Sequence, residues 1–159
     1  MLQRFTFPLT PIPKEEPVPT LRYEYALVMM KPDACRLGLT SALRAQIIAA
    51  GFEVIRSEAL TLSRDQAERL YDGSRGKAHF KDQVDFMVSG PVEAYAVRHK
   101  TESNPCPLLR TLIGATLPAD RDPASLRGRF GDPDVPRFNR IHGSDSPDEA
   151  RRELQIIFG

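Results

Sequence analysis

A short string near the end of the chain combines an imidazole, two hydroxyls and a carboxylate: His-Gly-Ser-Asp-Ser at residues 142–146. A helix start follows it, because Ser146 can be the N-cap, Pro147 the first helical residue and Glu149 the third residue of a capping box. Backbone N–H groups and the helix dipole favour negative charge at such a terminus. The imidazole of His142 therefore has the surroundings of a nucleophile that accepts a phosphoryl group, although the string alone fits a turn histidine before an ordinary helix equally well.

The loop from Gly114 to Arg127 is a second candidate region. It contains Thr116, and two arginines, Arg110 and Arg127, flank it. Arginine binds phosphate oxygens bidentately and keeps its charge, so two guanidiniums and a hydroxyl are suited to hold a polyphosphate. Long loops inside a compact domain are more often functional than not. Taken singly, an arginine in such a loop is more often a solvated surface residue than a phosphate ligand.

Other catalytic patterns are absent from the sequence. It has no Walker-type or protein-kinase glycine loop, no Ser/His/Asp nucleophile elbow and no metal-binding helix pair. Cys35 and Cys106 are isolated, without metal-ligand spacing or a disulfide framework, as in a cytosolic protein with reduced thiols. The net charge of +1 gives no electrostatic case for nucleic acid or a membrane surface as partner. No apolar run approaches a membrane span and no secretory signal is seen, so we expect a cytoplasmic protein.

The elements that must position these residues alternate between strands and helices. Apolar runs predict strands at 23–30, 52–62, 92–97 and 139–143. Helical spacing predicts helices at 39–50, 63–71, 80–88, 108–113 and 146–158. Ala150, Leu154, Ile157 and Phe158 are expected to face the core from the last helix. The order contains a split βαβ pair, so we predict an α/β (α+β) fold with a ferredoxin-like βαββαβ core, a four-stranded antiparallel sheet, helices on one face and added helices.

The first 22 residues differ from the rest. They contain five of the chain's fourteen prolines, at positions 8, 11, 13, 17 and 19. Such a segment cannot keep a regular hydrogen-bond ladder, so residues 1–22 are predicted to be a proline-rich N-terminal arm. Disorder is the favoured state, and docking on a neighbour through Phe5, Phe7 and Leu9 is the alternative. Residues 23–159 then form one domain, without an internal repeat.

Four motifs together match a known family. They are Lys31-Pro32-Asp33, Ser89-Gly90-Pro91, Arg127-Gly128 and Asn139-x-x-His142-Gly143-Ser144-Asp145-Ser146. Their order and spacing resemble those of nucleoside diphosphate kinases, from about Tyr25 to Phe158. The last string is specific, and with Lys-Pro-Asp upstream it makes chance agreement very improbable.

The resemblance implies reversible transfer of the γ-phosphate of a nucleoside triphosphate, with ATP as the usual donor, to a nucleoside diphosphate. The route would be ping-pong through phosphorylated His142. Mg²⁺ would be held mainly by the nucleotide phosphates, and no side chain is expected as a metal ligand. Neutral imidazole is a competent nucleophile and leaving group near pH 7, and cations would neutralise charge on a loose transition state.

The resemblance also implies roles for individual residues. Lys31 would reach the ribose hydroxyl and the transferred phosphoryl group, and Asn139 would hold the ribose. The phosphates would be held by Arg110, Thr116 and Arg127. Tyr71 would lie close to His142, and Glu153 would help orient the imidazole with Ser144 as its companion.

Departures from the family pattern concern the base and the assembly. His79 stands where the family usually places a phenylalanine as one wall of the base clamp; an imidazole can stack but offers less area. His79 could also be an ordinary exposed histidine, with Phe80 stacking instead. The segments before Arg110 and before Asn139 are slightly longer than usual. The C-terminal extension of many relatives is lacking, and since it and the proline-bearing loop often contribute to hexamers, we expect only a homo-oligomer built from dimers.

Three other functions are conceivable for this sequence. The main alternative is a catalytically weak member that acts as a regulatory or protein-interaction module through the arm; the complete set of site residues disfavours it. A nucleic-acid-binding protein on this fold is disfavoured because the predicted strands carry no aromatic pair for base stacking. Transfer of phosphate from His142 to other proteins stays open as a side activity, and the sequence does not indicate the preferred base.

Overall fold

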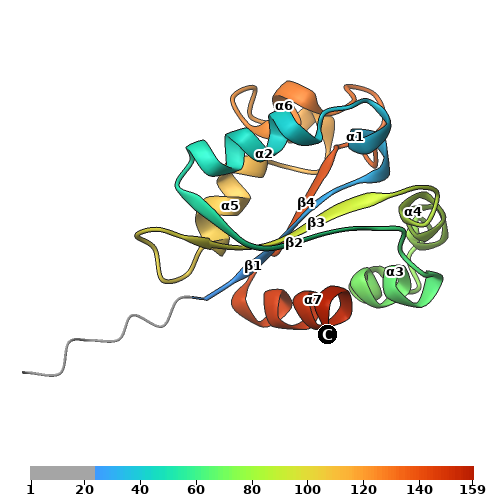
Figure 1. Cartoon of the computed structure of the whole chain (residues 1–159). Helices are drawn as coiled ribbons and strands as arrows, with labels where there is room; N and C mark the ends of the chain where they lie inside the picture. Colours follow the sequence, from blue (N-terminus) through green and yellow to red (C-terminus); the bar gives the residue numbers. More distant parts are fainter. Residues whose placement is uncertain (1–23) are drawn as a thin grey trace, which may run out of the picture.

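A four-stranded antiparallel sheet crosses the centre of the computed structural model, which describes residues 24–159 (Figure 1). The strands are β1 (Ala26–Met30), β2 (Phe52–Leu60), β3 (Val92–His99) and β4 (Ile141–Gly143). They lie in the order β2-β3-β1-β4. This order and the βαββαβ connection are those of the ferredoxin-like fold, so the predicted fold class is confirmed. The predicted arm at residues 1–22 lies outside the described residues.

Seven helices and two short 3₁₀ segments accompany this sheet in residues 24–159. They are α1 (Pro32–Arg36), α2 (Thr40–Ala49), α3 (Arg64–Leu70), η1 (Asp72–Ser74), α4 (Phe80–Met87), α5 (Cys106–Ile113), η2 (Pro118–Asp120), α6 (Leu126–Phe130) and α7 (Pro147–Phe158). The five predicted helices are all present. The short helices α1 and α6 were missed, because five residues are too few for an apolar period to stand out. None of these helices is long and apolar enough to span a bilayer.

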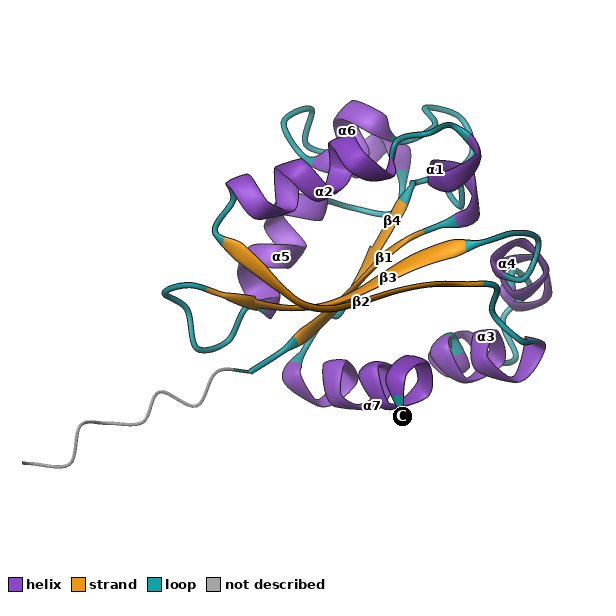
Figure 2. Ribbon diagram, in the orientation of Figure 1, coloured by secondary structure: helices purple, strands orange, loops and turns teal. Residues whose placement is uncertain are grey.

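Helices cover both faces of the sheet, so the prediction of helices on one face only is wrong. Figure 2 shows α2, α5 and α6 on one side and α3 and α7 on the other. On β1, Val28 packs in the core cluster with α2 and α5, while its neighbours Leu27 and Met29 pack in the cluster with α3, α4 and α7. All five residues of β1 have no exposed surface. A strand that is buried on both faces is apolar without alternation, as the sequence of β1 is.

Two helix starts carry the predicted serine caps. At α3, Ser63 Oγ accepts from the Gln66 amide and the Gln66 side chain accepts in return, so this capping box is confirmed. At α7, Ser146 Oγ accepts from the Glu149 amide, but the Glu149 carboxylate pairs with Arg152 at 2.6 Å instead. The reciprocal half of the predicted box at α7 is therefore wrong, because a guanidinium on the next turn binds the carboxylate.

A buried ion pair joins β4 to the helix that follows β1. The Asp33 carboxylate accepts from the Arg140 guanidinium at 2.8 Å and from the Arg140 backbone amide at 3.2 Å. Arg140 has φ of 74°, a conformation that side chains with a Cβ rarely adopt. Beyond it, β4 pairs with β1 so that His142 lies opposite Met29. The ion pair therefore helps to fix where the candidate nucleophile emerges from the sheet.

Candidate active site

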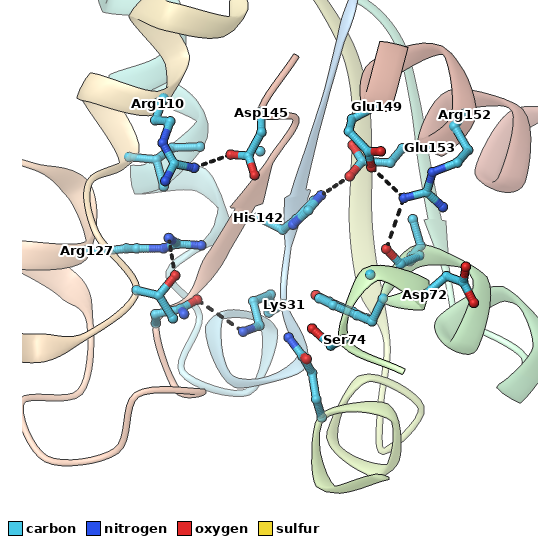
Figure 3. Close-up of a pocket in the computed structure, with 18 of the residues that line it drawn as sticks. Lys31, Asp72, Ser74, Arg110, Arg127, His142, Asp145, Glu149, Arg152 and Glu153 are labelled. Carbon is cyan, nitrogen blue, oxygen red and sulfur yellow. Dashed lines mark hydrogen bonds and ion pairs between the residues drawn. The ribbon is translucent and has the colours of Figure 1, made fainter. Parts of the chain in front are cut away.

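A cavity of about 600 Å³ opens beside β4. It collects side chains from Lys31 directly after β1, from the end of α3, and from α4, α5, α6, β4 and α7 (Figure 3). The predicted site residues that line it are Lys31, Tyr71, Arg110, Thr116, Arg127, Asn139, His142 and Glu153. Ser144 lies behind it, fully buried, and His79 lines a neighbouring cavity. Residues that are far apart in the sequence thus meet at one site.

The imidazole of His142 is held by a buried carboxylate. Its Nε2 lies 3.0 Å from Glu153 Oε1, and Ser144 Oγ donates to Glu153 Oε2 at 2.6 Å. Burial alone would raise the pKa of Glu153, but the charge and hydrogen bond of His142 and the hydrogen bond of Ser144 outweigh it and lower the pKa. A carboxylate is a pure acceptor, so Nε2 carries the proton. The lone pair of the neutral ring is then on Nδ1.

The phenol of Tyr71 packs against this imidazole. The two rings meet edge to face with centroids 6.0 Å apart. Tyr71 is the C-cap residue of α3, so the end of that helix sets its position. Burial raises the pKa of Tyr71 well above its ordinary value, so the phenol stays protonated. It can donate a hydrogen bond but brings no negative charge to the cavity.

Arg127 is locked in place by the backbone. Its Nε and Nη2 donate to Ile141 O at 3.2 and 2.8 Å, and its Nη1 donates to Gly114 O at 3.0 Å. The same Nη1 lies 3.2 Å from Thr116 Oγ1. Burial lowers the pKa of Arg127 to about 10, so the group is still cationic at neutral pH. A charge held by neutral carbonyls keeps an unbalanced positive potential for an anion.

Arg110 is held loosely in comparison. Its guanidinium forms an ion pair with Asp145, and the two side chains are 66% and 65% exposed. Exposed pairs of this kind contribute little free energy, since water screens them. A phosphate group can therefore replace Asp145 as the partner of Arg110 at small cost.

Lys31 is almost fully buried at the end of β1. Its Nζ donates to Arg137 O at 2.7 Å and to Asn139 Oδ1 at 3.1 Å, two neutral acceptors. Burial lowers the pKa of Lys31 to about 7, although the Asp33 charge opposes this shift. The Asn139 amide donates in turn to Pro136 O at 3.0 Å. Lys31 and Asn139 thus form one side of the cavity. An anion bound beside them would stabilise the charged ammonium of Lys31.

A second cavity, of about 370 Å³, adjoins the first and has a mainly apolar lining. His79, Leu117, Val135 and Pro136 contribute to it. Phe80 does not line it: its ring packs against the core cluster of α3, α4 and α7, and Arg75 lies 5.1 Å from its centroid. At this cavity the available aromatic side chain is the exposed imidazole of His79. A flat apolar group such as a base would fit there by stacking.

The two cavities share four lining residues: Lys31, Gln83, Thr116 and Asn139. Gln83 was missed by the sequence analysis. It follows His79 by one helical turn on α4, and residues at i and i+4 share a helix face, so this spacing was the signal that could have found it. Asp145, the partner of Arg110, was read only as part of the motif.

Carboxylates also line the larger cavity, among them Asp72, Asp145 and Glu149. Carboxylate oxygens are ligands that suit Mg²⁺. In residues 24–159, however, no three His, Cys, Asp or Glu side chains are grouped so that they could hold a metal ion by themselves. These carboxylates therefore suit a metal ion whose other ligands come from water or from a bound phosphate.

The sheet topology, together with a cavity that joins a carboxylate-bound histidine to Lys31, Arg110 and Arg127, defines a ferredoxin-like α+β protein with the features of a phosphoryl-transfer site. The family model for nucleoside diphosphate kinase matches residues 24–159. The chain belongs to the nucleoside diphosphate kinase family and is a phosphotransferase enzyme.

Individual relatives agree with this assignment. The chain is 39% identical to the nucleoside diphosphate kinase of Archaeoglobus fulgidus over 135 residues, which covers 85% of this chain and 86% of the relative. It is 37% identical to that of Halalkalibacterium halodurans, with 85% and 88% covered. The crystal structure of the Encephalitozoon cuniculi nucleoside diphosphate kinase superposes with a TM-score of 0.79 at 28% identity, over 86% of this chain and 89% of that one. The Aquifex aeolicus enzyme gives 0.77 at 30% identity, over 86% and 95%.

Proposed function

We propose that the enzyme transfers the γ-phosphate of a nucleoside triphosphate to a nucleoside diphosphate by a ping-pong route through phosphorylated His142. The observation that carries this proposal is the hydrogen bond of His142 Nε2 to Glu153, which leaves Nδ1 as the nucleophilic nitrogen in the cavity that Arg110 and Arg127 also line. ATP is the expected donor. The family membership supports nucleoside di- and triphosphates as substrates.

In the first half-reaction, Nδ1 of His142 attacks the γ-phosphorus. The N–P bond forms while the bond from phosphorus to the β,γ-bridging oxygen breaks, and the nucleoside diphosphate leaves with that electron pair. In the second half-reaction, a terminal oxygen of a different nucleoside diphosphate attacks the same phosphorus and the imidazole leaves. Arg110 and Arg127 bind phosphate oxygens with Thr116, and Lys31 stabilises the charge of the group in transfer.

Glu153 and Ser144 act on the ring during transfer. When Nδ1 gains a bond to phosphorus, the imidazole ring becomes cationic while its Nε2 proton stays in place. The carboxylate of Glu153 lies at that proton and stabilises the charge. Ser144 holds the carboxylate, and its own Oγ accepts from the Leu27 amide at 2.9 Å. The support for the nucleophile thus extends into the central strand.

We propose Mg²⁺ as the cofactor, held mainly by the nucleotide phosphates. Asp145 is a carboxylate of this chain available to its hydration shell. The bound ion would supply charge neutralisation on the phosphate oxygens. The base would lie in the apolar cavity against His79 and Leu117, and recognition by stacking there favours broad base tolerance.

Incubation with Mg²⁺ and γ-labelled ATP tests this function, with the products separated under alkaline conditions. We expect wild-type protein to take up an acid-labile label and to pass it to an added second nucleoside diphosphate. His142→Ala should take up none while it remains folded by circular dichroism. A folded wild type without label would contradict the enzyme function and would support the alternative, a regulatory or protein-interaction module.

We also propose that the enzyme works as a homo-oligomer built from dimers in the cytoplasm. The assembly is supported by the family resemblance alone, and light scattering checks it. Cell fractionation checks the location.

A further inference from the structure

Gln83 lies where the two cavities meet, and one of its side-chain atoms lacks a hydrogen-bond partner. It lies on α4 and lines both cavities, together with Lys31, Thr116 and Asn139. Its Oε1 is buried and has no hydrogen-bond partner. Buried polar atoms are nearly always paired, so an orphan acceptor at a ligand cavity points to a partner that arrives with the ligand.

The position of Gln83 indicates which part of a nucleotide it would meet. A nucleotide is a linear arrangement of phosphates, ribose and base. The larger cavity holds the cations suited to phosphates, and the smaller one has the apolar lining suited to a base. The ribose must therefore lie where the two cavities meet, and the side chains that line both of them must surround it.

The hydrogen-bonding chemistry agrees with that position. Lys31 and Asn139 already bond to each other at 3.1 Å and form one wall of the junction. Gln83 approaches from a different element, α4, with an amide that offers one acceptor and two donors. Because Oε1 is buried in this structure, it would meet the ligand after a turn about the terminal torsion, which exchanges Oε1 and Nε2 and has a broad, nearly two-fold energy profile. A ribose hydroxyl is the group at this level of a nucleotide that can donate to it.

We propose that Gln83 is a specificity-determining residue that hydrogen-bonds a ribose hydroxyl of the bound nucleotide. This inference rests on the proposed function, because it takes a nucleotide as the occupant of both cavities. The enzyme then distinguishes nucleoside diphosphates from one of their deoxy analogues through a residue on α4, in addition to Lys31 and Asn139.

The test is a thermodynamic cycle between the side chain and the sugar. Gln83→Met keeps the length and volume of the side chain and removes its hydrogen bonds. The ratio kcat/KM is measured for wild type and variant with GDP, 2′-deoxy-GDP and 3′-deoxy-GDP at fixed ATP and Mg²⁺. Gln46→Met on α2, a residue that lines neither cavity, changes the same residue type and is the matched control.

We expect Gln83→Met to lower kcat/KM for GDP about 2- to 10-fold, the effect of one hydrogen bond, mainly through a rise in KM. The loss should vanish for the one deoxy substrate that lacks the partner hydroxyl, which identifies it as the 2′ or the 3′ group. No loss with GDP, or the same loss with all three substrates, overturns the proposal.

These measurements distinguish a failure of the Gln83 proposal from a failure of the proposed function. If the wild type and Gln46→Met turn over none of the three substrates, the kinase assignment fails. If they do, the cycle reports on Gln83 alone. Should Gln83→Met fold poorly, Gln83→Leu, which also lacks the amide, takes its place in the cycle. Equal wild-type kcat/KM for GDP and both deoxy analogues leaves no hydroxyl to be recognised and overturns the proposal.

Discussion

At the scale of single residues, the side chain of Lys31 is partly deprotonated at neutral pH when no ligand is bound. Its Nζ is buried against the neutral acceptors Arg137 O and Asn139 Oδ1, and burial lowers its pKa to about 7. A bound polyphosphate stabilises the ammonium and raises this pKa, so binding must take up a proton wherever free Lys31 is mainly neutral. Calorimetry of ADP binding in buffers of different ionisation enthalpy should show an uptake that approaches one proton at about pH 8 and fades towards about pH 6.

Lys31→Met is the control for this proton linkage. It should bind ADP more weakly and should lose the proton uptake; an uptake equal to that of the wild type would assign the proton to another group. The same shift affects folding, with a definite sign. The unfolded lysine, with its ordinary pKa of 10.5, binds more protons than the folded one between about pH 7 and 10.5, so this residue makes the free energy of unfolding rise with pH across that window.

The site residues that the sequence indicates most specifically stand within motifs. His142, Asn139 and Lys31 stand in strings whose order and spacing are characteristic, and the structure brings them to one cavity. Gln83 belongs to no such string, and its importance appears only when its neighbours in space are known. The choice between His79 and Phe80 likewise depended on the rotation of α4, which a one-residue difference in a short apolar pattern does not fix.

At the scale of elements, the ion pair between Asp33 and Arg140 joins α1 to the start of β4. The two side chains are only 6% and 12% exposed, so loss of one partner leaves a buried charge without compensation. We expect Asp33→Ala to lower the free energy of unfolding by about 3–5 kcal/mol, measured by urea denaturation. It also removes the charge that opposes the lowered pKa of Lys31, so ADP affinity at neutral pH should fall as well.

Asp85→Ala is the matched control on the surface. Asp85 pairs with Arg64 and Lys81 at 2.7 and 2.6 Å, and these cations are largely exposed. Water screens such exposed pairs and they contribute little stability, so this variant should unfold nearly as the wild type does. If Asp33→Ala and Asp85→Ala lowered the free energy of unfolding by similar amounts, the buried pair would have no special part in fixing β4.

The long elements were predictable from the sequence, and the layers were not. Period and caps located α2, α3 and α7 to within a few residues, because each has its own apolar face and a serine or glycine boundary. The residues of β1 are uniformly apolar, which is the mark of a strand with two covered faces. The prediction that all helices lie on one face came from the fold class and not from these residues. It is wrong because α3 and α7, which are additions to the core fold, cover the second face.

At the scale of the whole molecule, the proposed site residues all belong to residues 24–159, the range that the structure describes. Both cavities, both core clusters and all the proposed site residues lie in that range. Glu24, the first described residue, is already tied to the domain: its amide donates to Ser103 O at 2.8 Å and its carboxylate pairs with Arg151 at 3.1 Å. Both contacts join Glu24 to residues of the domain itself, so we expect the domain to fold and to work without the proline-rich segment.

A variant that begins at Tyr23 tests this division of the chain. Because it keeps every contact named above, it should retain the wild-type kcat, KM and melting temperature. Light scattering then distinguishes two origins of the assembly: if the domain carries the contacts, the variant keeps the same multiple of the 17.8 kDa chain, less the deleted residues. A fall to monomers with unchanged kinetics would assign the subunit contact to the arm, as docking of Phe5, Phe7 and Leu9 would require. A loss of activity in a folded variant would contradict the division itself, since no residue before Tyr23 has a place in the proposed mechanism.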